Sequence, residues 1–224
     1  MISTDDPTTQ ARFNMVECQL KPGGVRDPQI TARVAQIPRD AFVAETARDV
    51  AYADRVVMST AGEASRPLLS PLSFGLLAEL AAISDDDILL DIGGGTGYAA
   101  AVLAGLAGTV IGLEDDARFG EKASAIWREL GVDNAVAVTG ALLEGQAKQA
   151  PFDVIFVNGE IADVPESLLA QLEDGGRLVC VQRVDGAPRG VVHRRIGADF
   201  VRRVGCDMSA PHLAAFDPPP TFEF

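Results

Sequence analysis

Short apolar runs alternate with amphipathic stretches through most of the chain, and this alternation predicts the fold class. Residues 88–92 are almost entirely apolar, which is typical of a strand buried on both faces of a sheet. Similar runs that predict strands occur at residues 109–113, 135–139, 154–157 and 177–181. Helices are predicted between them at residues 98–106, 118–130 and 168–172. The pattern predicts an α/β fold with a mostly parallel sheet and helices on both faces.

The first third of the chain is predicted to be helical. Residues 10–20 form one predicted helix, and Asp27 followed by Pro28 marks the start of a second. Ser70 followed by Pro71 gives the same signal before a leucine-rich helix. This region therefore precedes the alternating strands as a separate helical segment.

The C-terminal part has the pattern of strands that follow one another directly. Residues 191–196 and 200–204 predict an antiparallel pair, which gives a seven-stranded sheet with an antiparallel C-terminal edge. The tail is expected to add a last edge strand. Residues 218–220 are three prolines, which cannot donate to a ladder, and we expect them to form a turn or a cover for the sheet edge.

A glycine-rich loop directly follows the first core strand. Glycine permits positive φ angles and a close approach of a ligand to the backbone. A dinucleotide fingerprint that began at Gly93 would need its third glycine at position 98, which is Tyr98. The spacing Asp91-x-Gly93-x-Gly95-x-Gly97 instead resembles the first motif of S-adenosylmethionine-dependent methyltransferases. A nicotinamide oxidoreductase is thus disfavoured, whereas a glycine-rich turn without a ligand stays open.

An acidic residue ends the second core strand. Glu114 follows the run 109–113 and would lie at the carboxyl edge of a parallel sheet, where ligands bind. An ionised carboxylate with two oxygens can accept hydrogen bonds from both ribose hydroxyls of a nucleoside. We therefore predict that Glu114 binds the ribose, and the neighbouring Asp115 is a further candidate for cofactor binding. The alternative is an ordinary surface acid next to Asp115 and Asp116.

Composition narrows the class of partner. The chain has 224 residues with 19 Lys and Arg against 32 Asp and Glu, a formal net charge of −13. This balance argues against binding to nucleic acid or to an anionic membrane. No residue between Asp91 and Glu114 is charged, but the seven glycines within that span favour a loop over a membrane helix.

The cysteines and the first residues bear on the compartment. The three cysteines are widely spaced and match neither a zinc-ligand nor a redox motif, so no metal is predicted and a reducing compartment is expected. The first 25 residues contain several charges and no apolar stretch of signal-peptide length. We therefore expect a cytoplasmic protein.

Several segments outside the loop resemble the protein-L-isoaspartate O-methyltransferase family. They are Arg12-x-x-Met15-x-x-x-Gln19, Val25-x-Asp27, Ile37-Pro38-Arg39-x-x-Phe42-Val43, Ala51-Tyr52-x-Asp54 and Gln171-Leu172-x-x-Gly175-Gly176-Arg177-Leu178-Val179. The resemblance covers about three quarters of the chain, and the last 40 residues or so match only loosely. It implies a Rossmann-like methyltransferase domain over residues 1–224. Residues 1–70 would cover the active site, and residues 71–224 would bind S-adenosylmethionine.

The resemblance also implies a reaction. In this family a free isoaspartyl carboxylate of a damaged protein or peptide attacks the methyl group of S-adenosylmethionine, so the nucleophile is already ionised and no general base is needed. The two histidines, His193 and His212, are therefore not assigned a catalytic role. The alternatives are the same fold with another acceptor, such as a small molecule, and a protein that binds S-adenosylmethionine without catalysis.

The acceptor segment departs from the family pattern. The family has Thr-Ile-Ser-x-Pro before the helix that precedes the glycine loop. Counting back from Asp91 puts Leu69 at the hydroxyl position, directly before Ser70, whereas counting forward from Tyr52 puts Ser65 there and Arg66 beside it. The counts differ because about three extra residues lie between these points. We predict that Ser65, Arg66 and Ser70 form the acceptor side.

A second departure concerns the adenine. Ala141 and Leu142 stand where the family has an acidic residue and a glycine. Ala141 cannot accept a hydrogen bond through its side chain, and Asn158 is a possible substitute. The predicted cofactor residues are Asp91, Gly93, Gly95, Thr96, Gly97, Tyr98, Glu114, Asp115, Ala141, Leu142 and Asn158.

Overall fold

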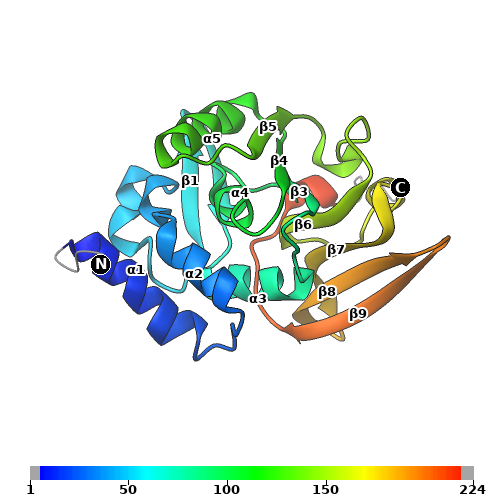
Figure 1. Cartoon of the computed structure of the whole chain (residues 1–224), viewed down its shortest axis with the longest axis horizontal. Coiled ribbons are helices and arrows are strands. Elements are labelled where there is room, and N and C mark those ends of the chain that lie inside the picture. Colours follow the sequence, from blue (N-terminus) through cyan, green and yellow to red (C-terminus); the bar gives the residue numbers. More distant parts are fainter. Residues whose placement is uncertain (1–5, 218–224) are drawn as a thin grey trace, which may run out of the picture.

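A computed structural model describes residues 6–217. Its main feature is a seven-stranded sheet in the order β5-β4-β3-β6-β7-β8-β9 (Figure 1). The strands are β3 (Ile88–Ile92), β4 (Thr109–Glu114), β5 (Ala135–Thr139), β6 (Phe152–Glu160), β7 (Leu172–Val184), β8 (Ala187–Ile196) and β9 (Asp199–Asp207). Neighbours from β5 to β7 pair in parallel, and β7-β8 and β8-β9 pair antiparallel. The predicted mostly parallel sheet with an antiparallel C-terminal edge is confirmed.

The two faces of the sheet are covered unequally. One face packs against α3 (Pro71–Ala81), α4 (Tyr98–Leu103) and α5 (Ala117–Leu130). The other face packs against the short α6 (Glu166–Leu169) and the 3₁₀ turns η4 (Leu142–Glu144) and η5 (Ala214–Phe216). Helical segments thus cover both faces, as predicted, but the longer helices lie on one side.

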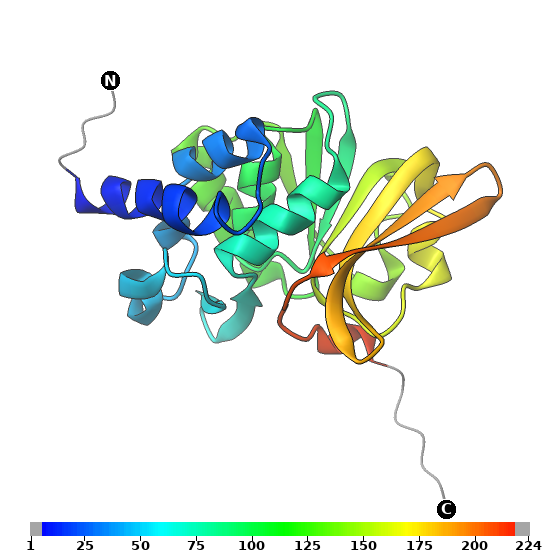
Figure 2. The same ribbon diagram turned by 90° about the horizontal axis from the view of Figure 1, so that it is seen from below.

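Strand β3 shows why both faces are apolar. Its side chains alternate between two cores, with Leu89 in the first and Leu90 and Ile92 in the second, and all three are buried. A strand at the centre of the sheet therefore needs apolar residues at successive positions. The β8-β9 hairpin projects beyond this body in both views (Figures 1 and 2).

The N-terminal helices follow their capping signals. Helix α1 (Pro7–Met15) starts three residues before the predicted 10–20 helix, because Asp6 caps it, and it continues into a π-helical turn, η1 (Val16–Leu20). Helix α2 (Pro28–Gln36) begins after Asp27, whose side chain accepts from Gln29 N. These helices lie on the same side of the molecule as α3 (Figure 2).

The prediction of a helical first third is wrong for residues 57–68. Two 3₁₀ turns, η2 (Arg39–Ala41) and η3 (Glu45–Val50), lead into a β-hairpin of β1 (Val57–Ala61) and β2 (Ala64–Leu68), which forms its own two-stranded sheet. Gly62 turns the hairpin with φ +60°. The β-branched residues of 56–60 suit this extended backbone.

Helix α3 begins where its sequence signal lies. The hydroxyl of Ser70 accepts from Ser73 N at 3.3 Å, which confirms the N-cap. The tail runs back along the carboxyl edge of the sheet, where His212 bridges to Glu160. No further strand forms within residues 208–217, so the expected edge strand is reduced to that bridge. The prolines at 218–220 lie outside the described residues.

The charge-free stretch between β3 and β4 resolves into a loop, helix α4 and turns. Within residues 6–217, each helix is too short or too polar to span a bilayer.

Candidate active site

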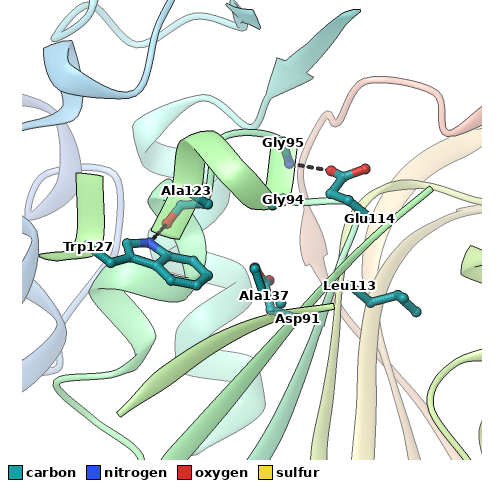
Figure 3. Close-up of a pocket in the computed structure, with 11 residues that line it drawn as sticks. Asp91, Gly94, Gly95, Leu113, Glu114, Ala123, Trp127 and Ala137 are labelled. Carbon is teal, nitrogen blue, oxygen red and sulfur yellow. Dashed lines mark hydrogen bonds between the residues drawn. The ribbon is translucent and has the colours of Figure 1, made fainter. Parts of the chain in front are cut away.

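The glycine loop connects β3 to α4 in backbone conformations that suit glycine. Gly93, Gly95 and Gly97 have φ angles of +73°, +61° and +86°. A Cβ atom at Gly97 would lie 2.6 Å from the ring of Trp127, and the Trp127 indole N–H donates to Gly97 O at 2.9 Å. Trp127 of α5 therefore packs against the end of the loop at Gly97 and fixes its path; its ring is drawn in Figure 3.

Glu114 reaches the loop from the end of β4. Its side chain is buried, with the residue 4% exposed, and its Oε1 atom accepts from Gly95 N (Figure 3). Burial raises the pKa of Glu114 to about 7, although the nearby Arg66 opposes that shift. The structure thus brings together the acid and the loop that the sequence predicted as one nucleoside site.

Arg66 of β2 lies over Glu114. Its Nη2 atom is 2.9 Å from Glu114 Oε2 and donates to Asp115 Oδ1 at 2.6 Å. The guanidinium carbon is also 5.5 Å from the centre of the Phe119 ring. Arg66 was predicted on the acceptor side, and the structure instead pairs it with two predicted cofactor residues, Glu114 and Asp115.

Asp91 lies beneath the loop and is fixed by Asn158. The Asn158 Nδ2 atom donates to Asp91 Oδ1 at 2.6 Å and to Ile92 O at 3.0 Å. Burial raises the pKa of Asp91 to about 7, and the Asn158 hydrogen bond opposes this rise. Asn158 therefore orients the first acid of the motif, and its amide donors are used within the protein.

Two predicted cofactor residues contact the N-terminal region instead. The Thr96 hydroxyl donates to Phe42 O, and Thr96 is buried. Tyr98 is buried against the Phe42 and Phe74 rings, with the Arg39 guanidinium 4.7 Å above its own ring. The structure places neither side chain in the loop cavity, so their assignment as cofactor ligands finds no support in the geometry.

Leucines from two distant segments flank Gly93. A Cβ atom at Gly93 would lie 3.3 Å from two Leu213 methyl carbons and 3.8 Å from one of Leu142. Of the two predicted cofactor residues that follow β5, Leu142 is buried and Ala141 is exposed. Leu213 was not predicted, because only the return of the tail to the sheet edge brings it here.

The acceptor segment lies beside the loop with a different set of residues from the one predicted. In the hairpin register Ser59 pairs with Arg66, and Ser65 pairs with Thr60. Ser59 is buried, and a Cβ atom at Gly95 would lie 2.4 Å from its Oγ. Ser65 is exposed on the alternate face of the hairpin, so the structure does not bring it to the loop.

The other two candidate positions have structural roles. Ser70 caps α3, and its Oγ lies 3.2 Å from Ser73 Oγ. Leu69 is buried, and its carbonyl accepts from Arg39 Nη2 at 2.6 Å. Counting along the sequence offered Leu69 and Ser65 but not Ser59, because the count does not give the hairpin register.

A cavity of about 10 Å³ lies under the loop, lined by Asp91, Gly95, Glu114 and Trp127 among others (Figure 3). That is room for about one water molecule. The residues around the loop fit a nucleoside, because a buried carboxylate that can accept hydrogen bonds faces a glycine loop with apolar side chains nearby. Among residues 6–217, no group of three or more His, Cys, Asp or Glu side chains is placed to hold a metal ion.

These features together define a class of protein. A parallel sheet with an antiparallel edge, a D-x-G-x-G-x-G loop after the central strand and an acid at the end of the next strand are the parts of a nucleoside-binding methyltransferase of the Rossmann-like class.

Comparison with known proteins gives the family. The sequence matches the protein-L-isoaspartate(D-aspartate) O-methyltransferase family over residues 11–192, and the chain belongs to that family. The protein-L-isoaspartate O-methyltransferase of Rhodopseudomonas palustris is 38% identical over 84% of this chain and 86% of its own. The enzyme of that name from Koribacter versatilis is 38% identical over 75% of this chain and 74% of its own. The family match ends at Val192, in agreement with the loosely matching C-terminal residues.

Solved structures agree. A structure of a protein-L-isoaspartate O-methyltransferase superposes with a TM-score of 0.78 at 27% identity, over 90% of this chain and 65% of the other, longer chain. A Plasmodium falciparum protein assigned to the same family, in complex with S-adenosyl-L-homocysteine, superposes with a TM-score of 0.73 over 93% of this chain and 99% of the other. At 18% identity that second likeness concerns the fold.

Proposed function

We propose that this chain transfers the methyl group of S-adenosylmethionine to the free carboxylate of isoaspartyl residues in peptides or proteins. The observation that carries the proposal is the buried Glu114 at the end of β4, bonded to the loop at Gly95 in a member of this family. Bound S-adenosylmethionine supplies an electrophilic methyl group on a sulfonium.

The residues around the loop have distinct roles in this proposal. Glu114 accepts hydrogen bonds from the ribose hydroxyls, and Asp91, held by Asn158, keeps the loop in its bound conformation. Leu142 and Leu213 offer an apolar wall beside Gly93. Because Ala141 offers no side-chain acceptor, the adenine is held in this proposal by apolar packing and by hydrogen bonds to the backbone.

The reaction needs no general base from the protein, since the attacking carboxylate is ionised at neutral pH. The protein then has to align the two reactants and exclude water, which can lower a barrier by roughly 7 to 11 kcal/mol. Residues 1–70 provide that cover in our proposal, with the β1-β2 hairpin directly against Gly95. The buried Arg39 positions the end of the segment through Leu69 O.

The test is a methyl-transfer assay with labelled S-adenosylmethionine and a pair of peptides that differ only in an isoaspartyl or an ordinary aspartyl linkage. We expect label on the isoaspartyl peptide only, released as methanol in base, as a methyl ester requires. The Glu114→Ala variant should lose most of this activity at low cofactor concentration. Equal or absent labelling of both peptides would contradict the proposal.

A different acceptor is the second candidate, and the hairpin favours it. The buried Leu69 stands at one possible hydroxyl position, and Ser65 at the other is exposed. An acceptor carboxylate on a small molecule would need fewer contacts from this segment than a peptide does. Labelling of the small-molecule fraction of a cell extract, with none on the isoaspartyl peptide, would support this candidate.

The proposed setting is the cytoplasm, where damaged proteins are available and the thiols of Cys18, Cys180 and Cys206 stay reduced. The net charge of −13 is consistent with a protein or small-molecule acceptor and disfavours nucleic acid.

A further inference from the structure

Arg66 contacts two acids in unequal ways. Its Nη2 atom makes an aligned hydrogen bond to Asp115 Oδ1 at 2.6 Å. The same atom lies 2.9 Å from Glu114 Oε2, but that oxygen receives no aligned hydrogen bond from the described residues. Arg66 is therefore anchored on Asp115 and only electrostatically paired with Glu114.

The guanidinium has unused donors. Its Nε atom is buried and has no hydrogen-bond partner among residues 6–217. A guanidinium offers five N–H donors in a planar fork that matches a carboxylate, and an unpaired buried donor is unfavourable. Arg66 thus has the chemistry to bind a further carboxylate, and Glu114 Oε2 has the chemistry to accept a hydroxyl.

The hairpin that carries Arg66 packs on the body through Val57 and Leu68, which are buried in the main core, and through a hydrogen bond from Ala44 N to Met58 O at 2.7 Å. It forms a separate two-stranded sheet, and such a hairpin is marginally stable by itself. The Ser59 hydroxyl donates to Arg66 O at 2.9 Å within the hairpin, and Lys122 donates to Thr60 O from α5. The cavity of about 10 Å³ under the loop, which Glu114 and Gly95 line, is smaller than a nucleoside.

We propose that Arg66 is an exchangeable cation that couples the two substrates: it holds the hairpin over Glu114, and it turns to the acceptor carboxylate once ribose hydroxyls bind Glu114. Asp115 remains its anchor throughout. The inference rests on the proposed function, and it implies that the cofactor binds before the acceptor. Arg66 is then a specificity-determining residue for an anionic acceptor.

The first part of the test needs no ligand. Amide hydrogen exchange of residues 57–68 is compared between the parent protein, Arg66→Ala and Arg118→Ala. Arg118 pairs with Asp116 beside the hairpin turn, so its variant removes the same charge nearby without touching Glu114. We expect exchange about fivefold faster in Arg66→Ala only. Parent-like exchange in Arg66→Ala would overturn the proposal.

The second part measures association of S-adenosylhomocysteine by the fluorescence of Trp127, the single tryptophan, which lines the cavity. Arg66→Ala should associate about fivefold faster than the parent protein, because the ion pair with Glu114 no longer has to break. Slower or unchanged association in Arg66→Ala would overturn the proposal that Arg66 holds the hairpin over Glu114.

The third part separates acceptor binding from chemistry. With the isoaspartyl peptide, Arg66→Ala should raise KM about tenfold or more with kcat near the parent value, and Arg66→Lys should restore part of the affinity. An unchanged KM would overturn the role in acceptor binding. If the parent protein binds S-adenosylhomocysteine but methylates no isoaspartyl peptide, the proposed acceptor is wrong. Amide hydrogen exchange and the association rate still test whether Arg66 holds the hairpin over Glu114.

Discussion

The glycine loop and the β1-β2 hairpin face each other across Gly95, yet only the loop could be interpreted from the sequence. The loop is determined locally, because the spacing of Asp91, Gly93, Gly95 and Gly97 sets both the turn and its ligand class. The hairpin is determined by contacts between distant residues. Arg66 meets Asp115 49 positions away, and Leu213 reaches Gly93 only through the fold of the tail.

The difference shows where sequence patterns carry functional information. A loop that binds through its backbone needs particular φ angles, and glycine positions record them. A surface that binds through side chains needs a register and a packing partner, which are not visible in residue spacing.

The largest effect concerns the loop side and its pH dependence. Burial raises the pKa of Asp91 from 3.8 to about 7, so the folded state holds the proton more tightly than the unfolded state. The contribution of Asp91 to stability is therefore fully present only below about pH 3.8 and is lost as the pH rises to about 7. The total is on the order of 4 kcal/mol, since one pKa unit is about 1.4 kcal/mol.

Denaturant unfolding of the parent protein and Asp91→Asn between pH 4 and 8 measures this effect. The free energy of unfolding of the parent protein, relative to that of the variant, should fall as the pH rises to about 7 and should be constant above that pH. A difference between the two proteins that does not change with pH would mean that Asp91 is ionised throughout. The rigid loop would then have to accommodate a buried charge.

The second effect concerns the hairpin side. Arg39 is 0% exposed and donates from Nε to Ala51 O at 3.0 Å as well as to Leu69 O. Arg39→Ala should lower the free energy of unfolding by about 2 to 4 kcal/mol, because it leaves two buried carbonyls unpaired and opens a cavity. The exposed Arg48→Ala is the control and should change stability by less than about 0.5 kcal/mol. If Arg39→Ala and Arg48→Ala lowered the free energy of unfolding equally, Arg39 would not be the residue that supports Leu69.

How much of the protein could be predicted follows the same division. The order of strands and helices from β3 to β9 was predictable, because buried strands and amphipathic helices have distinct apolar periods. The bounds of β6 and β7 were not, since both extend past their apolar runs into polar residues that pair with neighbours. Glu114 was found because it ends a strand beside the loop. Ser59 and Trp127 were missed, since a serine in a strand and a tryptophan in a helix carry no spacing signal.

The third effect concerns cofactor affinity. Glu114→Ala should weaken S-adenosylhomocysteine by about 1.5 to 3 kcal/mol, or roughly 10- to 150-fold, because a charged acceptor for two hydroxyls is lost. Titration calorimetry measures the dissociation constant, and Glu121→Ala controls for the loss of one exposed acid on α5. Matching dissociation constants in the two variants would leave Glu114 as a structural acid that only ties Gly95 to β4.

The fourth effect is the loss of the N-cap of α3. Ser70→Ala should lower the free energy of unfolding by about 0.5 to 2 kcal/mol, because Ser73 N loses its acceptor at the start of α3. Ser70→Asp keeps a cap and should recover most of that stability. A stable Ser70→Ala protein with slow methyl transfer would instead place this hydroxyl in the reaction, as the sequence-based expectation has it.

The smallest effect decides between the two serines of the hairpin. The forward alignment predicts that Ser65 faces the acceptor, whereas the register places Ser59 and Arg66 on the face toward Gly95. Ser65→Ala should therefore methylate the isoaspartyl peptide within about twofold of the parent rate, as exposed substitutions rarely cost more than about 0.5 kcal/mol.

Ser59→Ala should slow the same reaction by up to about tenfold at low peptide concentration, since the hydrogen bond that orients Arg66 O is worth about 0.5 to 1.5 kcal/mol. Initial rates at several peptide concentrations distinguish the two variants, and thermal unfolding checks that both are folded. A slow Ser65→Ala beside a parent-like Ser59→Ala would show that the acceptor meets the exposed face of the hairpin. Residue spacing would then have predicted the functional residues of the hairpin as well as those of the glycine loop.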